Sequence, residues 1–191
     1  MKKIIFAAIA VMAFGFTNAQ KARFGVKGGL NISNFSAGYN TDALVGFQLG
    51  GFAEIKVIDK LVIQPELLFS AQGAKYSFDR RDYNIRLNYF NIPVLAKYYI
   101  TKEFTVEAGP QLGFLVSATN DGTNVNGDYK TIDAGFNLGA GYNFNDNLSL
   151  GLRYTIGLSG IEKDRRDYGY YGRGYDDTRS GVLALSLAYK F

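Results

Sequence analysis

The residues from Gly181 to Phe191 alternate between two kinds of side chain, and this pattern limits the fold more than any other feature. One parity is large and apolar: Leu183, Leu185, Leu187, Tyr189 and Phe191. The other parity is smaller or polar: Val182, Ala184, Ser186, Ala188 and Lys190. A period of two over this length indicates a β-strand with two chemically different faces. The apolar face needs an apolar partner, either a protein core or lipid.

Seven earlier segments alternate in the same way, and no segment after residue 20 has the 3.6-residue apolar period of a helix. We predict eight strands near residues 22–32, 43–57, 61–73, 87–100, 104–118, 132–144, 148–159 and 181–191. The predicted connections alternate between tight ones, at 58–60, 101–103 and 145–147, and long ones, at 33–42, 74–86, 119–131 and 160–180. In an up-and-down meander, the long loops then share one rim, and the tight turns share the other rim with both termini.

The distribution of charge and of aromatic residues distinguishes a membrane barrel from a soluble one. The apolar faces carry no charge, and a Lys or Arg facing lipid at mid-membrane would cost about 2–4 kcal/mol. The polar faces are mostly Gly, Ser, Asn and Gln, which suits a narrow interior better than bulk water. Aromatic residues of the apolar faces gather near both strand ends, as at the two membrane interfaces. The pattern predicts an all-β fold, an eight-stranded antiparallel up-and-down transmembrane β-barrel.

The first nineteen residues have the layout of a cleaved secretory signal peptide. Lys2 and Lys3 precede an apolar run from Ile4 to Phe16, and small residues end at Ala19 before Gln20. The domain prediction is therefore a signal peptide over 1–19 and an outer-membrane barrel over 20–191. Without the leader, 19 basic residues face 17 acidic ones, too even a balance to indicate a nucleic-acid partner. The chain has no cysteine, which rules out a lipoprotein anchor and disulfides.

Three segments carry a resemblance to a known family: LVIQPELLFSAQGAKY at 61–76, LNYFNIPVLAKYYI at 87–100 and VEAGPQLGFL at 106–115. Together they resemble the outer-membrane β-barrel family of Bacteroidota usually called the "porin family", over about residues 21 to 191. The resemblance implies a small eight-stranded barrel in the cell outer membrane. It implies no catalytic or ligand-binding residue, since none defines the family. A few relatives in the family are linked to type IX secretion and gliding.

Catalysis is not expected of this chain. It contains neither histidine nor cysteine, which removes the usual bases, nucleophiles and zinc ligands. We predict no enzyme activity, no catalytic residue, no metal and no cofactor. The segment NDGTNVNGD at 120–128 superficially resembles a calcium loop, but the first and twelfth ligand positions fail. We interpret Asn126-Gly127 as a type I′ hairpin tip.

Charged residues on the polar parity are predicted to fill the barrel as an interior plug: Lys27, Glu54, Glu66, Lys97, Glu107, Asp133 and Arg153. An eight-stranded barrel is just wide enough for its own side chains, and buried ions must be paired. We expect Lys97 and Arg153 to lie among Glu66, Glu107 and Asp133. The alternative is that these groups line a polar pathway.

The sequence DRRDY occurs twice, at 79–83 and 164–168, in two predicted long loops on opposite sides of the ring. One interpretation is a bipartite external recognition surface, because Arg and Tyr anchor many interfaces. Its residues would be Arg80, Arg81, Tyr83, Arg165, Arg166, Tyr168, Tyr170 and Tyr171. The other interpretation, which we favour, is that the balanced charges keep long hairpins soluble and contact lipid headgroups.

The sequence therefore predicts an integral outer-membrane barrel with a structural or surface-interaction role. A small diffusion channel and an accessory of a secretion or motility machine are the alternatives. Expected partners are outer-membrane lipid, the barrel-assembly machinery during biogenesis, and an extracellular or envelope protein. Phe191, the aromatic end of the last strand, resembles the signal that the assembly machinery reads, and we expect it to serve insertion.

Overall fold

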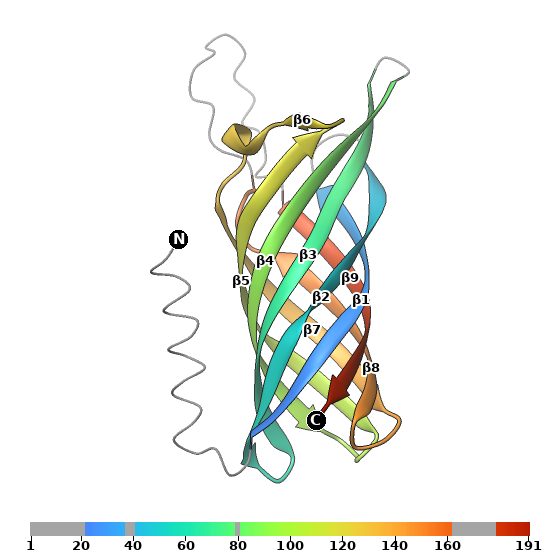
Figure 1. Ribbon diagram of the computed structural model, residues 1–191, viewed down its shortest axis with the longest axis vertical. Helices are drawn as coiled ribbons and strands as arrows, with labels where there is room; N and C mark the ends of the chain where they lie inside the picture. The colour runs from blue at the N-terminus through green and yellow to red at the C-terminus, as the bar shows by residue number, and fades with distance from the viewer. Residues whose placement is uncertain (1–21, 37–40, 79–80, 162–178) are drawn as a thin grey trace.

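A computed structural model describes residues 22–36, 41–78, 81–161 and 179–191. Over these residues the chain forms one closed antiparallel barrel (Figure 1). Eight strands build the wall: β1 (Ala22–Ser36), β2 (Thr41–Ile58), β3 (Leu61–Phe78), β4 (Arg81–Tyr99), β5 (Phe104–Asn120), β7 (Ile132–Asn143), β8 (Leu148–Gly157) and β9 (Arg179–Lys190). A two-residue strand, β6 (Thr123–Asn124), and a 3-10 turn, η2 (Asn126–Asp128), lie in the connection between β5 and β7.

Each wall strand pairs with its neighbours in the chain, and β1 pairs with β9 to close the ring. The closing ladder runs from Gly25 opposite Lys190 to Ser36 opposite Arg179. Closure leaves no free sheet edge, so every strand of the wall has a neighbour on both sides. The predicted fold class is confirmed.

Alternation decides what each face of the wall contacts. Outward residues such as Leu49 and Leu187 are more than half exposed, whereas the inward Leu68 and Leu95 are completely buried. Aromatic side chains lie at both ends of the outer apolar belt. Phe69 packs between Phe47 and Phe90 near one end, with ring centroids 5.9 and 5.7 Å away. Near the other end, Phe104 and Tyr142 are 5.0 Å apart.

The strands of the β1–β2 and β3–β4 hairpins are longer than predicted. The connections predicted at 33–42 and 74–86 are mostly strand, because β3 and β4 stay paired as far as Phe78 opposite Arg81. The links between described strands are then only 37–40 and 79–80. The long end of the β3–β4 hairpin rises above the rest of the wall in Figure 1. Backbone pairing there does not require an apolar face, so alternation gives no signal for it.

The connection between β5 and β7 also differs from the prediction. Its hairpin tip is Asp121-Gly122, with φ of 45° and 84° at the two residues, as a two-residue turn of type I′ requires. Asn126 lies in η2 instead, and its side-chain oxygen accepts a hydrogen bond from the Ala118 backbone N–H. The prediction that Asn126-Gly127 forms the hairpin tip was therefore wrong.

Candidate functional site

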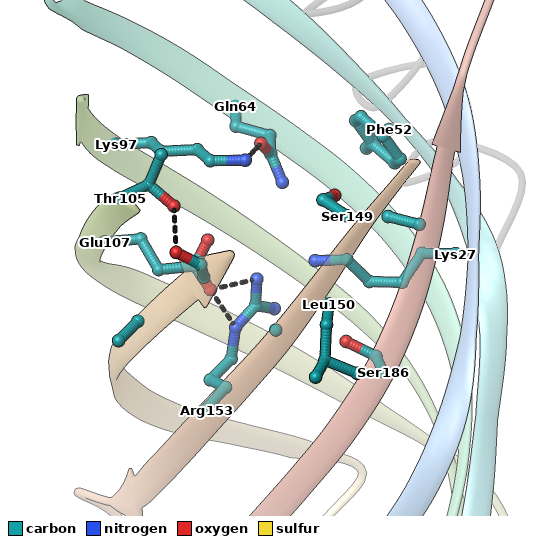
Figure 2. A pocket seen from close by; sticks show the side chains of 14 residues that line it. Lys27, Phe52, Gln64, Lys97, Thr105, Glu107, Ser149, Leu150, Arg153 and Ser186 are labelled. Carbon is teal, nitrogen blue, oxygen red and sulfur yellow. Dashed lines mark hydrogen bonds and ion pairs between the residues drawn. The ribbon is translucent and has the colours of Figure 1, made fainter. Parts of the chain in front are cut away.

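The centre of the barrel holds a cluster of four charged side chains, Lys27, Glu66, Glu107 and Arg153. Arg153 contacts Glu66 at 2.7 Å and Glu107 at 2.6 Å, and Lys27 contacts Glu66 at 2.7 Å. The Glu66 side chain is 0% exposed and that of Arg153 is 7% exposed. Figure 2 shows the Arg153 guanidinium directed at the Glu107 carboxylate, with the Lys27 ammonium close by. We call this group the central ion cluster.

The ring order explains why these four residues meet. They come from β1, β3, β5 and β8, which are every second strand around the ring. Inward side chains of alternate strands lie at similar heights in a tilted barrel, so they form layers across the interior. A glycine on a neighbouring strand leaves room for these side chains. A Cβ on Gly139 of β7 would lie 2.9 Å from Oε1 of Glu107.

A second ion group lies nearer the short-turn end and joins Glu54, Lys97 and Lys190. The Glu54 carboxylate contacts Lys97 at 2.9 Å and Lys190 at 3.4 Å, and it also accepts from the Tyr99 hydroxyl at 3.2 Å. These residues belong to the strands between those of the central ion cluster, β2, β4 and β9. Gln64 connects the two groups, since it donates to Glu66 at 2.6 Å and accepts from Lys97 at 3.3 Å.

The predicted partners of Lys97 and Asp133 were wrong. Lys97 is opposite Glu107 in the β4–β5 ladder, but it pairs with Glu54, because Arg153 already occupies both Glu66 and Glu107. Asp133 is half-buried away from the central ion cluster, where its carboxylate accepts a 2.6 Å hydrogen bond from the Ser159 hydroxyl. Alternation within one strand predicts which face of the wall a residue lies on, but not its position along the barrel axis.

Three residues of these ion groups were missed at the level of sequence, Gln64, Tyr99 and Lys190. All three lie on the inward parity of their strands. Lys190 could have been found by the rule that selected the others, because it is the one charged residue on the polar parity of the last strand. Gln64 and Tyr99 carry no formal charge, and a search for charges does not select them.

The long-loop end of the barrel is filled by apolar side chains. Leu87 and Ala118, both 0% exposed, and Tyr89 point inward from the wall. Tyr129 and Ile161, from the connections after β5 and β8, pack on the same cluster. Their segments are joined by a 2.8 Å backbone hydrogen bond from Lys130 to Ile161. Between this cluster and the ions lies a hydrogen-bonded layer in which Asn31 donates to Ser70 at 2.8 Å.

Among the described residues, the space beside the central ion cluster is small. The cavity beside the central ion cluster, whose lining is drawn in Figure 2, has a volume of about 20 Å³. This volume is close to the minimum of about 10–15 Å³ that holds one water. A larger cavity of about 220 Å³ opens at the short-turn end, between Arg23, Glu54 and Lys190. The described residues contain no group of three or more carboxylate, histidine or cysteine side chains that could hold a metal ion.

The candidate recognition residues are largely outside the described part of the chain. Arg80, Arg165, Arg166, Tyr168, Tyr170 and Tyr171 fall in the segments 79–80 and 162–178. Arg81 and Tyr83 belong to β4, paired with Phe78 and Tyr76, and not to a loop as predicted. At the opposite end of the barrel, Phe191 is exposed on the outer face. Its backbone N–H donates to the Phe24 carbonyl at 2.9 Å.

A closed barrel with an apolar outer belt, aromatic residues at both ends of the belt and paired charges inside defines an integral β-barrel protein of a bacterial outer membrane. Residues 18–162 match the model of the family described as "Outer membrane protein beta-barrel domain". The chain belongs to this family, and the protein is an outer-membrane protein. Within the described residues, no helix is long and apolar enough to cross a membrane.

A relative and two solved structures are similar to this chain. Outer membrane protein S2 of Salmonella typhi is 35% identical over 103 residues, which are 53% of this chain and 24% of that protein. Neisserial surface protein A has a similar structure, with a TM-score of 0.57, 17% identity, and coverage of 90% of this chain and 100% of the other. Ail, the attachment invasion locus protein of Yersinia pestis, has a TM-score of 0.52, 14% identity and the same coverage. At these identities the two structures are evidence of a shared fold.

Proposed function

We propose that the protein is a closed, non-catalytic barrel that anchors surface loops in the outer membrane. Its role is structural or one of surface interaction. The observation that carries the proposal is the contact of Arg153 with Glu66 and Glu107 across the centre of the barrel, at 2.7 and 2.6 Å. A barrel whose axis is blocked by its own ion pairs acts through its outer surface and its loops.

The energetics of the interior support a plug over a polar pathway. A buried charge that loses its partner costs about 3–5 kcal/mol, so the central ion cluster resists being pulled apart to admit a solute. The apolar cluster around Leu87 and Tyr129 adds a second barrier at the long-loop end. A diffusion channel would need both barriers to open together.

The two copies of DRRDY support a contact role for the long-loop end. Arg and Tyr are the residue types that anchor protein interfaces, and the run YGYYGRGY at 168–175 resembles adaptable binding loops. The expected partner is an extracellular or envelope protein. The opposing role, solubility and contact with lipid headgroups, would need only the charges and not the tyrosines.

We also propose that a signal peptide at 1–19 is cleaved during export and that both ends of the mature chain face the periplasm. The basic start and the small-residue site before Gln20 support cleavage. The narrower assignment to the "porin family" of Bacteroidota rests on the three segments at 61–76, 87–100 and 106–115.

Site-specific labelling in intact cells tests the surface role. The chain has no cysteine of its own, so Tyr170→Cys and Lys60→Cys each create a single labelling site. A membrane-impermeant maleimide should label Tyr170→Cys in whole cells and Lys60→Cys only after the outer membrane is opened. The reverse pattern would contradict the orientation. Equal labelling of both positions in intact cells would contradict the prediction that the two positions lie on opposite sides of the outer membrane.

A partner can then be sought with matched loop variants. Affinity capture from solubilised outer membranes should recover a stoichiometric protein with the wild type. Replacing Tyr168, Tyr170 and Tyr171 by serine should abolish capture of that protein. This variant keeps the charged residues of the loop, so it separates the effect of the tyrosines from that of the charges. Recovery that depends on the arginines but not on the tyrosines would favour the headgroup interpretation.

A further inference from the structure

The small cavity beside the central ion cluster has a lining that is mainly positive. Its charged residues are the cations Lys27, Lys97 and Arg153 and the carboxylate Glu107. Figure 2 shows the ammonium groups of Lys27 and Lys97 directed from opposite sides toward the middle of the site. Three buried cations therefore meet one carboxylate around a single space, and such a lining favours a negatively charged occupant.

Lys27 brings N–H donors to this space that its ion pair does not use. An ammonium group has three N–H donors, and among the described residues the hydrogen-bond acceptor of Lys27 is Glu66, at 2.7 Å. Glu66 lies outside the lining of the cavity, and the Lys27 side chain is only 7% exposed. Bulk water therefore does not serve the remaining donors, and an acceptor for them has to occupy the cavity.

Two serine hydroxyls add to the donors of the lining. Ser149 of β8 and Ser186 of β9 are both buried and both line the cavity. Ala188 is opposite Lys27 in one ladder and opposite Ser149 in the next, and its methyl group leaves open the space that a larger side chain would fill. A hydroxyl can rotate to donate to an anion, so these serines suit the same occupant as the Lys27 ammonium.

The two ion groups together carry one more positive than negative charge. The cations are Lys27, Lys97, Arg153 and Lys190, and the carboxylates are Glu54, Glu66 and Glu107. The Glu54 carboxylate serves two ammonium groups, Lys97 at 2.9 Å and Lys190 at 3.4 Å. An ion without compensation in a protein interior costs several kcal/mol. A water molecule in the cavity would accept hydrogen bonds but leave this charge unbalanced, whereas an anion does both.

The volume of the cavity limits the kind of anion. About 20 Å³ is little more than one water molecule needs. Phosphate, sulfate and carboxylates have several heavy atoms each and do not fit. A single-atom anion does fit, and chloride is the abundant ion of that kind in aqueous surroundings.

We propose that the barrel binds one chloride ion in the cavity beside the central ion cluster. The ion lies against the Lys27 ammonium and accepts hydrogen bonds from the hydroxyls of Ser149 and Ser186. Its charge balances the excess cation, so it completes the interior plug. The site does not rest on the proposed surface role, because the cavity and its charges are the same whatever the external loops bind.

Long-wavelength diffraction from crystals of the folded barrel grown in sodium chloride tests the position of the ion. Chloride scatters anomalously at such wavelengths, and water does not. We expect one anomalous peak in the cavity, within hydrogen-bond reach of Lys27 Nζ and of the two serine hydroxyl oxygens. A water molecule there without anomalous signal would overturn the proposal. Anomalous peaks confined to exposed cations such as Lys102 would overturn it as well.

Urea unfolding in detergent tests the same site in solution. A ligand that binds only the folded state stabilises it with the logarithm of its concentration. The urea midpoint of the wild type should therefore rise as sodium chloride replaces sodium gluconate at constant ionic strength. Equal midpoints in the two salts would contradict the proposal.

Matched serine variants locate the effect. Ser149→Ala combined with Ser186→Ala removes two donors and no ion pair, and the dependence of the midpoint on chloride should fall at least several-fold. Ser117→Ala is the control, because Ser117 lies on β5 and does not line the cavity, and it should keep the full dependence. An undiminished dependence in the double variant would contradict the assigned site. If the double variant fails to fold, the single variants and the diffraction experiment decide.

Discussion

Arg153 donates two hydrogen bonds to Glu66, at 2.7 and 2.9 Å, from the opposite side of the barrel. Their strands, β8 and β3, are four places apart in the ring of eight. The pair therefore crosses the full width of the interior. Lys27 and Glu107 lie on the two strands midway between them, β1 and β5, and complete a cross-shaped layer. This layer ties together strands that do not share a hydrogen-bonded ladder.

Removing the carboxylate at the centre of this layer should destabilise the barrel. Glu66→Ala leaves Lys27 without its ion pair and Arg153 with only Glu107, which should cost about 3–5 kcal/mol. Asp59→Ala is the control, because it breaks the exposed pair with Lys56, whose Asp59 side chain is 98% exposed, and should leave stability unchanged. Urea unfolding in detergent, followed by circular dichroism, measures both. An unchanged urea midpoint for Glu66→Ala, together with a large new conductance in planar bilayers, would refute the plug.

The hairpin tip at Asp121-Gly122 can be tested by a pair of glycine variants. Gly122 has φ of 84°, and no atom lies within 4 Å of an added Cβ, so Gly122→Ala costs only backbone strain, about 1 kcal/mol. Gly127→Ala also meets open space and should have no effect. Amide exchange of Val125, whose N–H donates to Ala118 at 3.0 Å, should accelerate in Gly122→Ala alone. Equal acceleration in both variants would place the tip elsewhere.

Phe191 should matter for assembly. Its N–H donates to Phe24 across the closing seam, and its ring is 5.7 Å from that of Tyr189. Deleting Phe191 removes the seam bond and the aromatic end together, so the fraction of folded barrel in the outer membrane should fall. Phe191→Tyr keeps both features and should be close to the wild type. The heat-modifiable band on gels measures the folded fraction, and an undiminished band for the deletion would count against the proposed signal.

The turn at 101–103 gives a prediction about pH. The Thr101 hydroxyl donates to the Glu103 carboxylate at 2.8 Å, and this bond, with the Glu103 backbone N–H, holds the pKa of that carboxyl below its ordinary value. Its contribution to stability is therefore present above the unfolded-state pKa and is lost as the pH falls through the folded-state pKa. Thr101→Val should raise the pKa of Glu103, as read by NMR titration. An unmoved pKa would show that the backbone contact alone sets it.

Alternation alone predicted the eight wall strands and the inward or outward face of their residues, because burial on two sides of a closed sheet repeats every two residues. It could not predict how far the β3–β4 hairpin extends, since paired backbone beyond the apolar belt needs no alternation. Alternation also could not predict the position of each inward residue along the barrel axis. Lys97 and Glu54 meet because of strand tilt and because Arg153 already holds Glu66 and Glu107.

Conductance of the wild-type barrel in planar lipid bilayers tests the central claim most directly. The small cavity of about 20 Å³ beside Arg153 and the apolar cluster at the long-loop end predict a barrel that inserts without forming steady conducting channels. Insertion is verified on the same sample by the heat-modifiable band. Stable, reproducible single-channel steps from folded wild-type protein would contradict the account.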